Sequence, residues 1–171
     1  NQDACPSTAT ISKAPQVFGR WQTLQFGDGV TVINDAYNAN PSSVRLALRY
    51  FPPPGPVSGR SVFVFGEMYE LGSNAASHHR KVAEHMNLFS NIDLLIALGP
   101  LTHHTVEVCE SDQTEDSWHY YETWSDDLPE KIAALLQPGD TVLLKASRGM
   151  RLERLIPAIE ARFGKAQDTP G

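Results

Sequence analysis

The 171-residue sequence predicts an α/β fold, with a doubly wound, mostly parallel sheet that is preceded by an N-terminal hairpin. Two apolar runs, residues 61–65 and Leu94–Leu98, are hydrophobic at nearly every position, which is typical of strands buried on both faces of a parallel sheet. Segments with helical character separate the predicted strands. Helices of this kind join parallel strands through right-handed crossovers, so we expect them to cover both faces of the sheet.

The first expected elements are a hairpin and a capped helix. Residues 22–26 and 30–33 are predicted to pair across a Gly-Asp-Gly turn, because Asp-Gly between alternating apolar residues favours a hairpin. Asn40 can cap the next helix, residues 42–51, because its side chain can accept a hydrogen bond from a free amide of the first turn. Pro41 suits the first helical position, where no amide hydrogen is needed.

The later elements alternate between strands and helices. A proline-rich stretch stops the first helix, since proline has no amide hydrogen and clashes with the preceding turn. The strands beyond it are short β-branched or apolar runs. In chain order, the sequence predicts a strand at 61–65, a helix at 76–89, a strand at Leu94–Leu98, a helix at 102–108, a strand at Trp118–Tyr121, a helix at 128–136, a strand at 141–144 and a helix at 152–163.

Composition indicates one domain, from residue 17 to residue 164. A chain with 41% apolar residues and this length can build one compact core and is too short for two. Residues 1–16 are rich in Ser, Thr, Ala and Pro without apolar periodicity, so we expect an interdomain linker or an arm added for expression. Residues 165–171 are expected to form a flexible tail.

Charge and cysteine content narrow the range of partners and compartments. A net charge of −6 gives no general attraction to polyanions, so nucleic acid is not an expected partner. Cys5 and Cys109 are too few and too far apart for a disulfide framework, and neither the cysteines nor the histidines have metal-binding spacing. Because no apolar run reaches membrane length and no signal-like segment occurs, we expect a cytoplasmic protein without membrane insertion.

Residues 34–41 are the strongest functional signal. They follow a predicted strand and offer a carboxylate, an aromatic ring and two amides from Asp35, Tyr37, Asn38 and Asn40. Ligands of open α/β sheets bind beyond the carboxyl ends of the strands, and this inventory suits a ribose and a base. Asn38 is the better ligand candidate of the two amides, because Asn40 already has a capping role. Tyr37 could instead pack into the core, as aromatic residues beside helix starts often do.

A second group follows the last predicted strand. Lys145, Ser147 and Arg148 offer two cations and a hydroxyl at the same edge of the sheet, a combination that fits anions. Neither cation lies on an apolar helical face that would bury it, so we expect its replacement to leave stability nearly unchanged. The alternative is a loop at a helix start with solvated charges.

No phosphate-binding loop accompanies these residues. The chain has neither Gly-x-Gly-x-x-Gly after its first strand nor Gly-x-x-x-x-Gly-Lys-Ser/Thr. The first absence argues against a dinucleotide-binding oxidoreductase, and the second leaves the chain without its own phosphate cradle. Alone, this chain is expected to hold only part of a nucleotide such as ATP.

Four motifs follow one another at predicted strand ends. They are Gly19-Arg20, Asp-Ala-Tyr-Asn-Ala-Asn-Pro at 35–41, Gly-Glu-Met-Tyr-Glu-Leu-Gly at 66–72 with His79-Arg80 after it, and Lys-Ala-Ser-Arg-Gly-Met-Arg-Leu-Glu at 145–153. Together they resemble the C-terminal domain of the Mur ligases, specifically the branch that adds D-alanyl-D-alanine to UDP-N-acetylmuramoyl-tripeptide. The match spans residues 17 to 163 and implies a Rossmann-like domain of an ATP-dependent amide ligase in peptidoglycan synthesis.

The resemblance implies one part of a larger enzyme. In Mur ligases, a central domain carries the phosphate loop and the Mg²⁺ ligands, an N-terminal domain binds the UDP sugar, and the C-terminal domain closes over ATP. The implied reaction converts the substrate carboxylate into an acyl phosphate, which the amine of D-alanyl-D-alanine then attacks. By itself the chain is expected to be inactive.

The resemblance also assigns roles to individual residues. It implies nucleotide binding by Arg20, Asp35, Tyr37, Asn38 and Asn40, and places Glu67, Glu70, His79, Lys145, Ser147 and Arg148 near the substrate. The two glutamates are expected near the incoming amine, although acidic loop residues are more often solvated, and His79 is expected to be structural rather than a general base. Ala146 stands where the family has glycine, so a positive φ there would be strained.

Two alternatives stay open. Another Mur-type ligase, a folylpolyglutamate synthetase or a cyanophycin synthetase would share the fold, but these usually have His where this chain has Asn-Ala-Asn. A stand-alone nucleotide-binding module without catalysis would need no further domains. An upstream Gly-Lys-Thr/Ser phosphate loop would favour the ligase.

Overall fold

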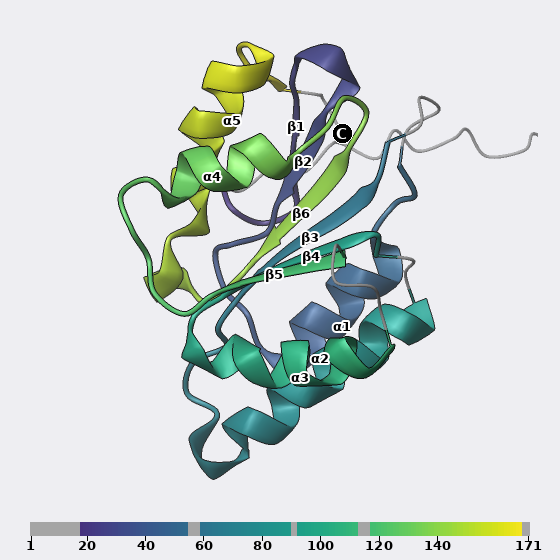
Figure 1. Ribbon diagram of the computed structural model, residues 1–171, viewed down its shortest axis with the longest axis vertical. Helices are drawn as coiled ribbons and strands as arrows, with labels where there is room; N and C mark the ends of the chain where they lie inside the picture. The colour runs from purple at the N-terminus through teal and green to yellow at the C-terminus, as the bar shows by residue number, and fades with distance from the viewer. Residues whose placement is uncertain (1–17, 55–58, 90–91, 113–116, 169–171) are drawn as a thin grey trace, which may run out of the picture.

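A computed structural model describes residues 18–54, 59–89, 92–112 and 117–168, which build a seven-stranded sheet of order β5-β4-β3-β6-β2-β1-β7 (Figure 1). The five strands β2 to β6 run parallel to one another, whereas β1 pairs antiparallel with both β2 and β7. The strands are β1 (Gln22–Gln25), β2 (Thr31–Asn34), β3 (Ser61–Gly66), β4 (Leu94–Leu98), β5 (Trp118–Tyr121), β6 (Thr141–Lys145) and β7 (Gln167–Asp168).

Helices cover both faces of this sheet, which confirms the doubly wound α/β class (Figure 1). The first three helices lie on one face and the last two on the other. They are α1 (Pro41–Tyr50), α2 (Ala75–Phe89), α3 (His103–Asp112), α4 (Leu128–Leu135) and α5 (Ile156–Phe163). The predicted elements are therefore present, with bounds that shift by a few residues at α3.

The last predicted helix is the element that differs most. Its first turn is a separate 3-10 turn, Leu152–Leu155, and the α-helix begins only at Ile156. The residue before the turn, Arg151, has a left-handed backbone conformation with φ of 52°. A proline in the first turn of α5 favours a new helix start there, because its missing amide hydrogen is not needed at that point.

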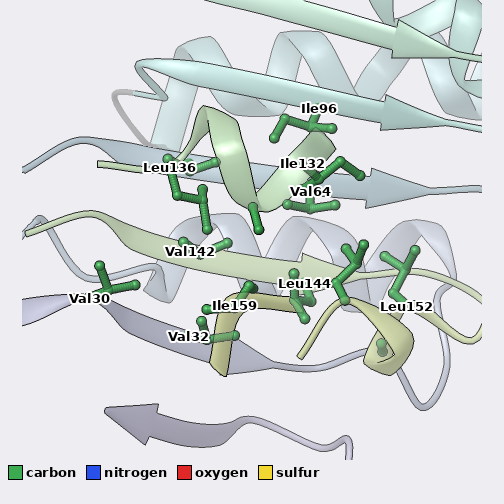
Figure 2. Close-up of a cluster of buried hydrophobic side chains, with 14 of the residues drawn as sticks. Val30, Val32, Val64, Ile96, Ile132, Leu136, Val142, Leu144, Leu152 and Ile159 are labelled. Carbon is green, nitrogen blue, oxygen red and sulfur yellow. The ribbon is translucent and has the colours of Figure 1, made fainter. Parts of the chain in front are cut away.

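Alternation along the central strands builds two hydrophobic cores, one on each face. Val62 and Val64 of β3 pack with α4 and α5, while Phe63 and Phe65 pack with α1, α2 and α3. The same alternation recurs in β4 and β6, because successive side chains of a strand point to opposite faces. Figure 2 shows the first of these cores, in which Ile132, Leu136 and Ile159 face the valines of the sheet.

The two ends of the chain compare differently with expectation. The predicted linker at 1–16 lies outside the described residues. The predicted tail begins at residue 165, but Gln167–Asp168 pairs with β1 and adds a strand at the edge of the sheet. The expectation of a flexible tail is therefore wrong for these two residues. The remaining residues, 169–171, also lie outside the described part.

A buried ion pair fixes the start of β6. Asp140 is fully buried, and its carboxylate accepts hydrogen bonds from the backbone amides of Arg60 and Gln137, at 2.9 and 2.8 Å. The Arg60 guanidinium donates to both carboxylate oxygens, at 3.3 and 2.8 Å. One side chain thus satisfies backbone amides on two separate segments beside the central strand.

We predict that Asp140→Ala destabilises this chain by about 3 to 5 kcal/mol, because it leaves the Arg60 charge and two amides without their buried acceptor. Chemical denaturation checks the change in the free energy of unfolding. The control is Asp127→Ala, which removes an exposed carboxylate paired with Lys131 at 2.7 Å and should leave the unfolding midpoint close to wild type. Equal effects of both substitutions would contradict the prediction.

Candidate functional site

The carboxyl ends of the parallel strands bring the predicted site residues to one edge of the sheet. β2 and β6 are neighbours, with Asn34 opposite Leu144, so the segments that follow both strands lie side by side. β3 flanks β6 on its other side, which places the loop after Gly66 against the same group. Segments that are far apart in the sequence therefore meet as predicted.

Lys145 is buried, contrary to the expectation of a surface cation. Its side chain is only 2% exposed, and Nζ lies 2.7 Å from Oδ2 of Asp35. The same nitrogen donates to the backbone carbonyl of Asn38 at 2.7 Å and to that of Asp35 at 3.3 Å. Burial lowers the pKa of Lys145, while the Asp35 carboxylate raises it in opposition. Lys145 is buried because it belongs to the buried strand β6, and the oxygens of Asp35 and Asn38 compensate its charge.

Asp35 links this lysine to the segment before β1. Its Oδ1 accepts a hydrogen bond from the backbone amide of Trp21 at 3.2 Å. Trp21 has a left-handed backbone with φ of 50°, which is unusual for a bulky side chain. The Asp35 side chain is 18% exposed, so its carboxylate also reaches the surface. Sequence reasoning missed Trp21; its position directly after Gly19-Arg20 is the only signal that could have identified it.

Tyr37 is exposed rather than buried, so the alternative of a core residue is wrong. Its side chain is 41% exposed. The Arg20 guanidinium lies 4.6 Å from the ring centroid and that of Arg148 lies 5.7 Å from it, as expected for cation–π contacts. Gly19 has a φ of +71° and accepts the Tyr37 amide at 2.9 Å. The close approach that Gly19 allows is thus to Tyr37.

Asn40 has the capping role that the sequence predicted, whereas a ligand contact of Asn38 stays a prediction. Asn40 caps α1: its side chain accepts the Ser43 amide at 2.9 Å, and the Ser43 hydroxyl accepts the Asn40 amide at 3.0 Å. Asn38 is exposed and offers its backbone carbonyl to Lys145. Both residues border a pocket of about 340 Å³ whose lining is Arg20, Trp21, Asp35, Tyr37, Asn38, Asn40, Ser43 and Lys145. All five residues that the sequence assigned to nucleotide binding therefore gather around one pocket.

The loop after β6 is more structural than the sequence suggested. Ser147 is buried, and its hydroxyl accepts the Tyr69 amide at 2.8 Å and donates to the carbonyl of Ala39 at 3.4 Å. Ala146 is buried and has no positive φ, so its replacement of the family's glycine causes no backbone strain. Arg148, by contrast, is 53% exposed and pairs with Glu153 at 2.8 Å.

The loop after β3 contains a buried carboxylate. Glu67 is 7% exposed, so the alternative of a solvated acid is wrong for it, and its Oε1 accepts the Leu101 amide at 2.9 Å. Gly99 permits this approach: a Cβ there would lie 2.7 Å from the Glu67 carboxyl carbon. Glu70 is exposed, with φ of 62°. The loop thus carries one interior and one surface carboxylate.

Glu67 borders a second pocket, of about 230 Å³, that the sequence did not indicate. Arg154 also lines this pocket, with its guanidinium 3.8 Å from the ring centroid of Trp124. Trp124, Glu122 and Met150 complete much of the wall. Neither Arg154 nor Trp124 stands in a strand-end motif, so no sequence pattern pointed to them. This pocket places carboxylates and a guanidinium on one surface.

His79 is structural, as expected. It is fully buried on α2, where Nδ1 contacts the Ala75 carbonyl at 2.8 Å and Nε2 accepts the Met68 amide at 3.1 Å. This pattern requires the neutral ring with its proton on Nδ1. Burial lowers the pKa of His79, and its bond to Ala75 opposes that shift. The side chain therefore holds the Glu67 loop against α2.

Neither a metal-binding cluster nor a membrane-spanning helix occurs among residues 18–54, 59–89, 92–112 and 117–168. Within them, no three His, Cys, Asp or Glu side chains gather as a metal-binding group. In the same residues, no helix is both long and apolar enough to cross a bilayer.

The domain is an open α/β fold that presents a carboxylate, an exposed aromatic ring and two guanidinium groups at the carboxyl ends of its parallel strands, where ligands of such folds bind. Residues 19–148 match the family model described as "Mur ligase, glutamate ligase domain". The chain therefore belongs to the Mur ligase family and corresponds to that domain.

Individual relatives agree with this assignment. The chain is 33% identical over 176 residues to UDP-N-acetylmuramoyl-tripeptide–D-alanyl-D-alanine ligase of Mycobacterium tuberculosis, covering 90% of this chain and 33% of that protein. A crystal structure of MurF ligase from Thermotoga maritima in complex with ADP is 29% identical with a TM-score of 0.63, covering 88% and 32%. MurF from Acinetobacter baumannii is 26% identical with a TM-score of 0.69, covering 86% and 31%. The chain thus spans about a third of the length of these relatives.

We predict that His79 makes the chain less stable as the pH falls. Burial lowers the pKa of the folded-state histidine below its ordinary 6.5, so the unfolded chain binds the proton more readily. The His79 contribution is complete above that value and is lost below it, at no more than about 1.4 kcal/mol per pH unit. Denaturation between about pH 7.5 and 5.5 should show a weaker pH dependence in His79→Gln than in wild type. His85, whose pKa burial also lowers, is common to both proteins and cancels.

Proposed function

We propose that this chain is the C-terminal domain, residues 17–164, of an ATP-dependent ligase that adds D-alanyl-D-alanine to UDP-N-acetylmuramoyl-tripeptide. The observation that carries the proposal is the 33% identity over 90% of the chain to a ligase of that name. The site supports it in two ways. The pocket around Asp35 has groups that suit a ribose, and the sequence has neither of the two phosphate-loop motifs, as the domain division of the Mur ligases implies. The same identity favours this ligase over a folylpolyglutamate or cyanophycin synthetase and over a non-catalytic module.

The nucleotide half of the proposal rests on the pocket around Asp35. The exposed part of this carboxylate would accept hydrogen bonds from ribose hydroxyls. Tyr37 offers an accessible ring that could stack on a base. Arg20, which lies 4.6 Å from the ring centroid, offers a cation that could bind a phosphate. Asn38 supplies an exposed amide, while Asn40 contributes mainly by capping α1. The residues present therefore fit part of ATP.

The substrate half rests on the second pocket and the loop after β6. D-alanyl-D-alanine carries an ammonium at one end and a carboxylate at the other. Glu67, with Glu70 outside the pocket, would attract the amine, and the cations Arg154 and Arg148 would attract the carboxylate or the acyl phosphate. Ser147 would act by holding the loop, since its hydroxyl is already bonded on both sides.

In the proposed reaction, a carboxylate oxygen of the tripeptide attacks the γ-phosphorus of ATP and releases ADP. The dipeptide amine then attacks the acyl carbon, an amide bond forms, and phosphate leaves with the former carboxylate oxygen. Both steps are favoured by orientation and by stabilisation of negative charge. This chain would supply orientation by closing over the nucleotide, which explains why it should be inactive alone.

The remaining components would come from elsewhere in the enzyme. We assign the phosphate loop and the Mg²⁺ ligands to a central domain, and the UDP-sugar site to an N-terminal domain, so both domains are partners of this chain. We propose a cytoplasmic location, because the proposed substrates ATP and UDP-N-acetylmuramoyl-tripeptide are cytoplasmic.

We predict that the 171-residue chain binds ATP only weakly, with a dissociation constant of about 1 mM or more, because the phosphates have no cradle here. Isothermal titration calorimetry of the purified chain measures this. A constant of about 1 μM would show that a complete nucleotide site exists in this chain and would overturn the division into domains.

We predict that Asp35→Asn in the full-length ligase raises KM for ATP about ten-fold and changes KM for D-alanyl-D-alanine much less. The substitution keeps the shape of the side chain but replaces a charged acceptor that faces the ribose. Steady-state kinetics with each substrate varied in turn will show the split. Asp28→Asn, in the exposed turn between β1 and β2 at the other end of β2 from Asp35, serves as the matched control. Unchanged ATP kinetics in a folded Asp35 variant would remove the ribose assignment.

A further inference from the structure

Lys145 has no hydrogen-bonding capacity left for a substrate. An ammonium group has three N–H donors, and Nζ has three acceptors within reach: Oδ2 of Asp35 at 2.7 Å, the Asn38 carbonyl at 2.7 Å and the Asp35 carbonyl at 3.3 Å. With 2% of the side chain exposed, solvent and ligands have almost no access to it. A cation that is both enclosed and fully bonded is unsuited to binding a phosphate or a carboxylate.

The acceptors of Lys145 define the turn on which the nucleotide-facing groups stand. Two of them are the backbone carbonyls of Asp35 and Asn38, at the two ends of a four-residue segment. Tyr37 lies between them and is exposed. The third acceptor is the Asp35 carboxylate, whose other oxygen holds the Trp21 amide. A single ammonium therefore orients the carboxylate and both ends of the turn.

We propose that Lys145 is a positioning residue that presents Asp35 and Tyr37 to the nucleotide and touches neither substrate. This inference rests on the proposed function. It moves the role of anion-binding cation in this loop to Arg148, which is 53% exposed and lies 5.7 Å from the Tyr37 ring centroid. Lys145 acts on the reaction only through the turn at 35–38.

Lysine suits this position for a geometric reason. The three acceptors converge on one atom, and a compact ammonium donates in three directions from a single nitrogen. A guanidinium spreads its donors over a planar fork and needs more room, so Lys145→Arg keeps the charge but not the geometry. Lys145→Met keeps the length of the side chain and removes the charge. Comparing the two variants separates the effect of the positive charge from the effect of the three hydrogen bonds that meet at one nitrogen.

The test uses the full-length ligase with Lys145→Met, Lys145→Arg, Asp35→Asn and the double variant Asp35→Asn/Lys145→Met. Lys131→Met, which removes an exposed lysine from α4, is the matched control and should leave both KM values unchanged. We expect both Lys145 variants to raise KM for ATP about ten-fold with little effect on KM for the dipeptide. In the double variant the two effects should not add, because both substitutions disturb the same contact.

Hydrogen–deuterium exchange of the same proteins gives a readout independent of catalysis. We expect the amides of Trp21 and Tyr37, bonded at 3.2 and 2.9 Å, to exchange faster in both Lys145 variants, while amides of β4 stay protected. If Lys145→Met does not fold, the test uses Lys145→Arg and the double variant. The double variant is expected to fold more easily, because it leaves no unpaired carboxylate at position 35.

Several results would overturn the positioning role. They are additive effects of Asp35→Asn and Lys145→Met, a larger rise in KM for the dipeptide than for ATP, and unchanged exchange of the turn. A purely structural role would lower the unfolding temperature without moving KM, which would also overturn it. If the wild-type protein lacks ligase activity, the proposed function fails, whereas exchange of the turn still decides whether Lys145 controls it.

Discussion

The central strand β6 is held by a buried charge at each end. Asp140 precedes its first residue and pairs with Arg60, while Lys145 is its last residue and pairs with Asp35. Between them the strand is buried throughout and pairs in parallel with β2 and β3. A register slip by one residue would turn its side chains to the opposite face and take both charges from their partners. The two ion pairs therefore fix the register of the middle of the sheet.

This constraint also determines where the turn at residues 35–38 lies. Lys145 belongs to β6 and binds both ends of the 35–38 turn. The sheet therefore fixes the position of the turn. The Trp21 and Tyr37 amides extend the anchoring to the segment before β1. Functional groups on loops reach precise positions when a rigid scaffold supports them in this way. The hairpin at the start of the domain is thus part of the support of the site.

The fold was largely predictable, because its signals are local. Continuous apolar runs marked β3 and β4, and the Asn40-Pro41 pair marked the start of α1. The two-residue strand β7 was not predictable, since its pairing with β1 depends on contacts between the two ends of the domain. The split before α5 depends on the left-handed Arg151, which no sequence rule indicated.

The sequence predicted which residues would meet around the first pocket better than it predicted how deeply each one is buried. Asp35 and Lys145 were predicted to lie together, because both stand at the carboxyl ends of strands. The burial of Lys145 was not predicted, because it depends on the depth of β6 in the sheet and on the 35–38 turn, whose carbonyls contact its ammonium. The burial of Glu67 was not predicted for the same reason, because the loop that contacts it at Gly99 is distant in sequence. Arg154 and Trp124 were missed because they meet only in three dimensions.

One close contact limits how the ligand-facing loops can be exchanged between relatives. A methyl group on Gly66 would lie 2.7 Å from Cβ of Ala146, so the space between the ends of β3 and β6 accommodates a single methyl. Grafting a loop with glycine at 146 would empty that space and cost about 1 kcal/mol, whereas alanine at 66 against Ala146 would force the strands apart. Chimeric enzymes built on this domain would need both loops from the same parent.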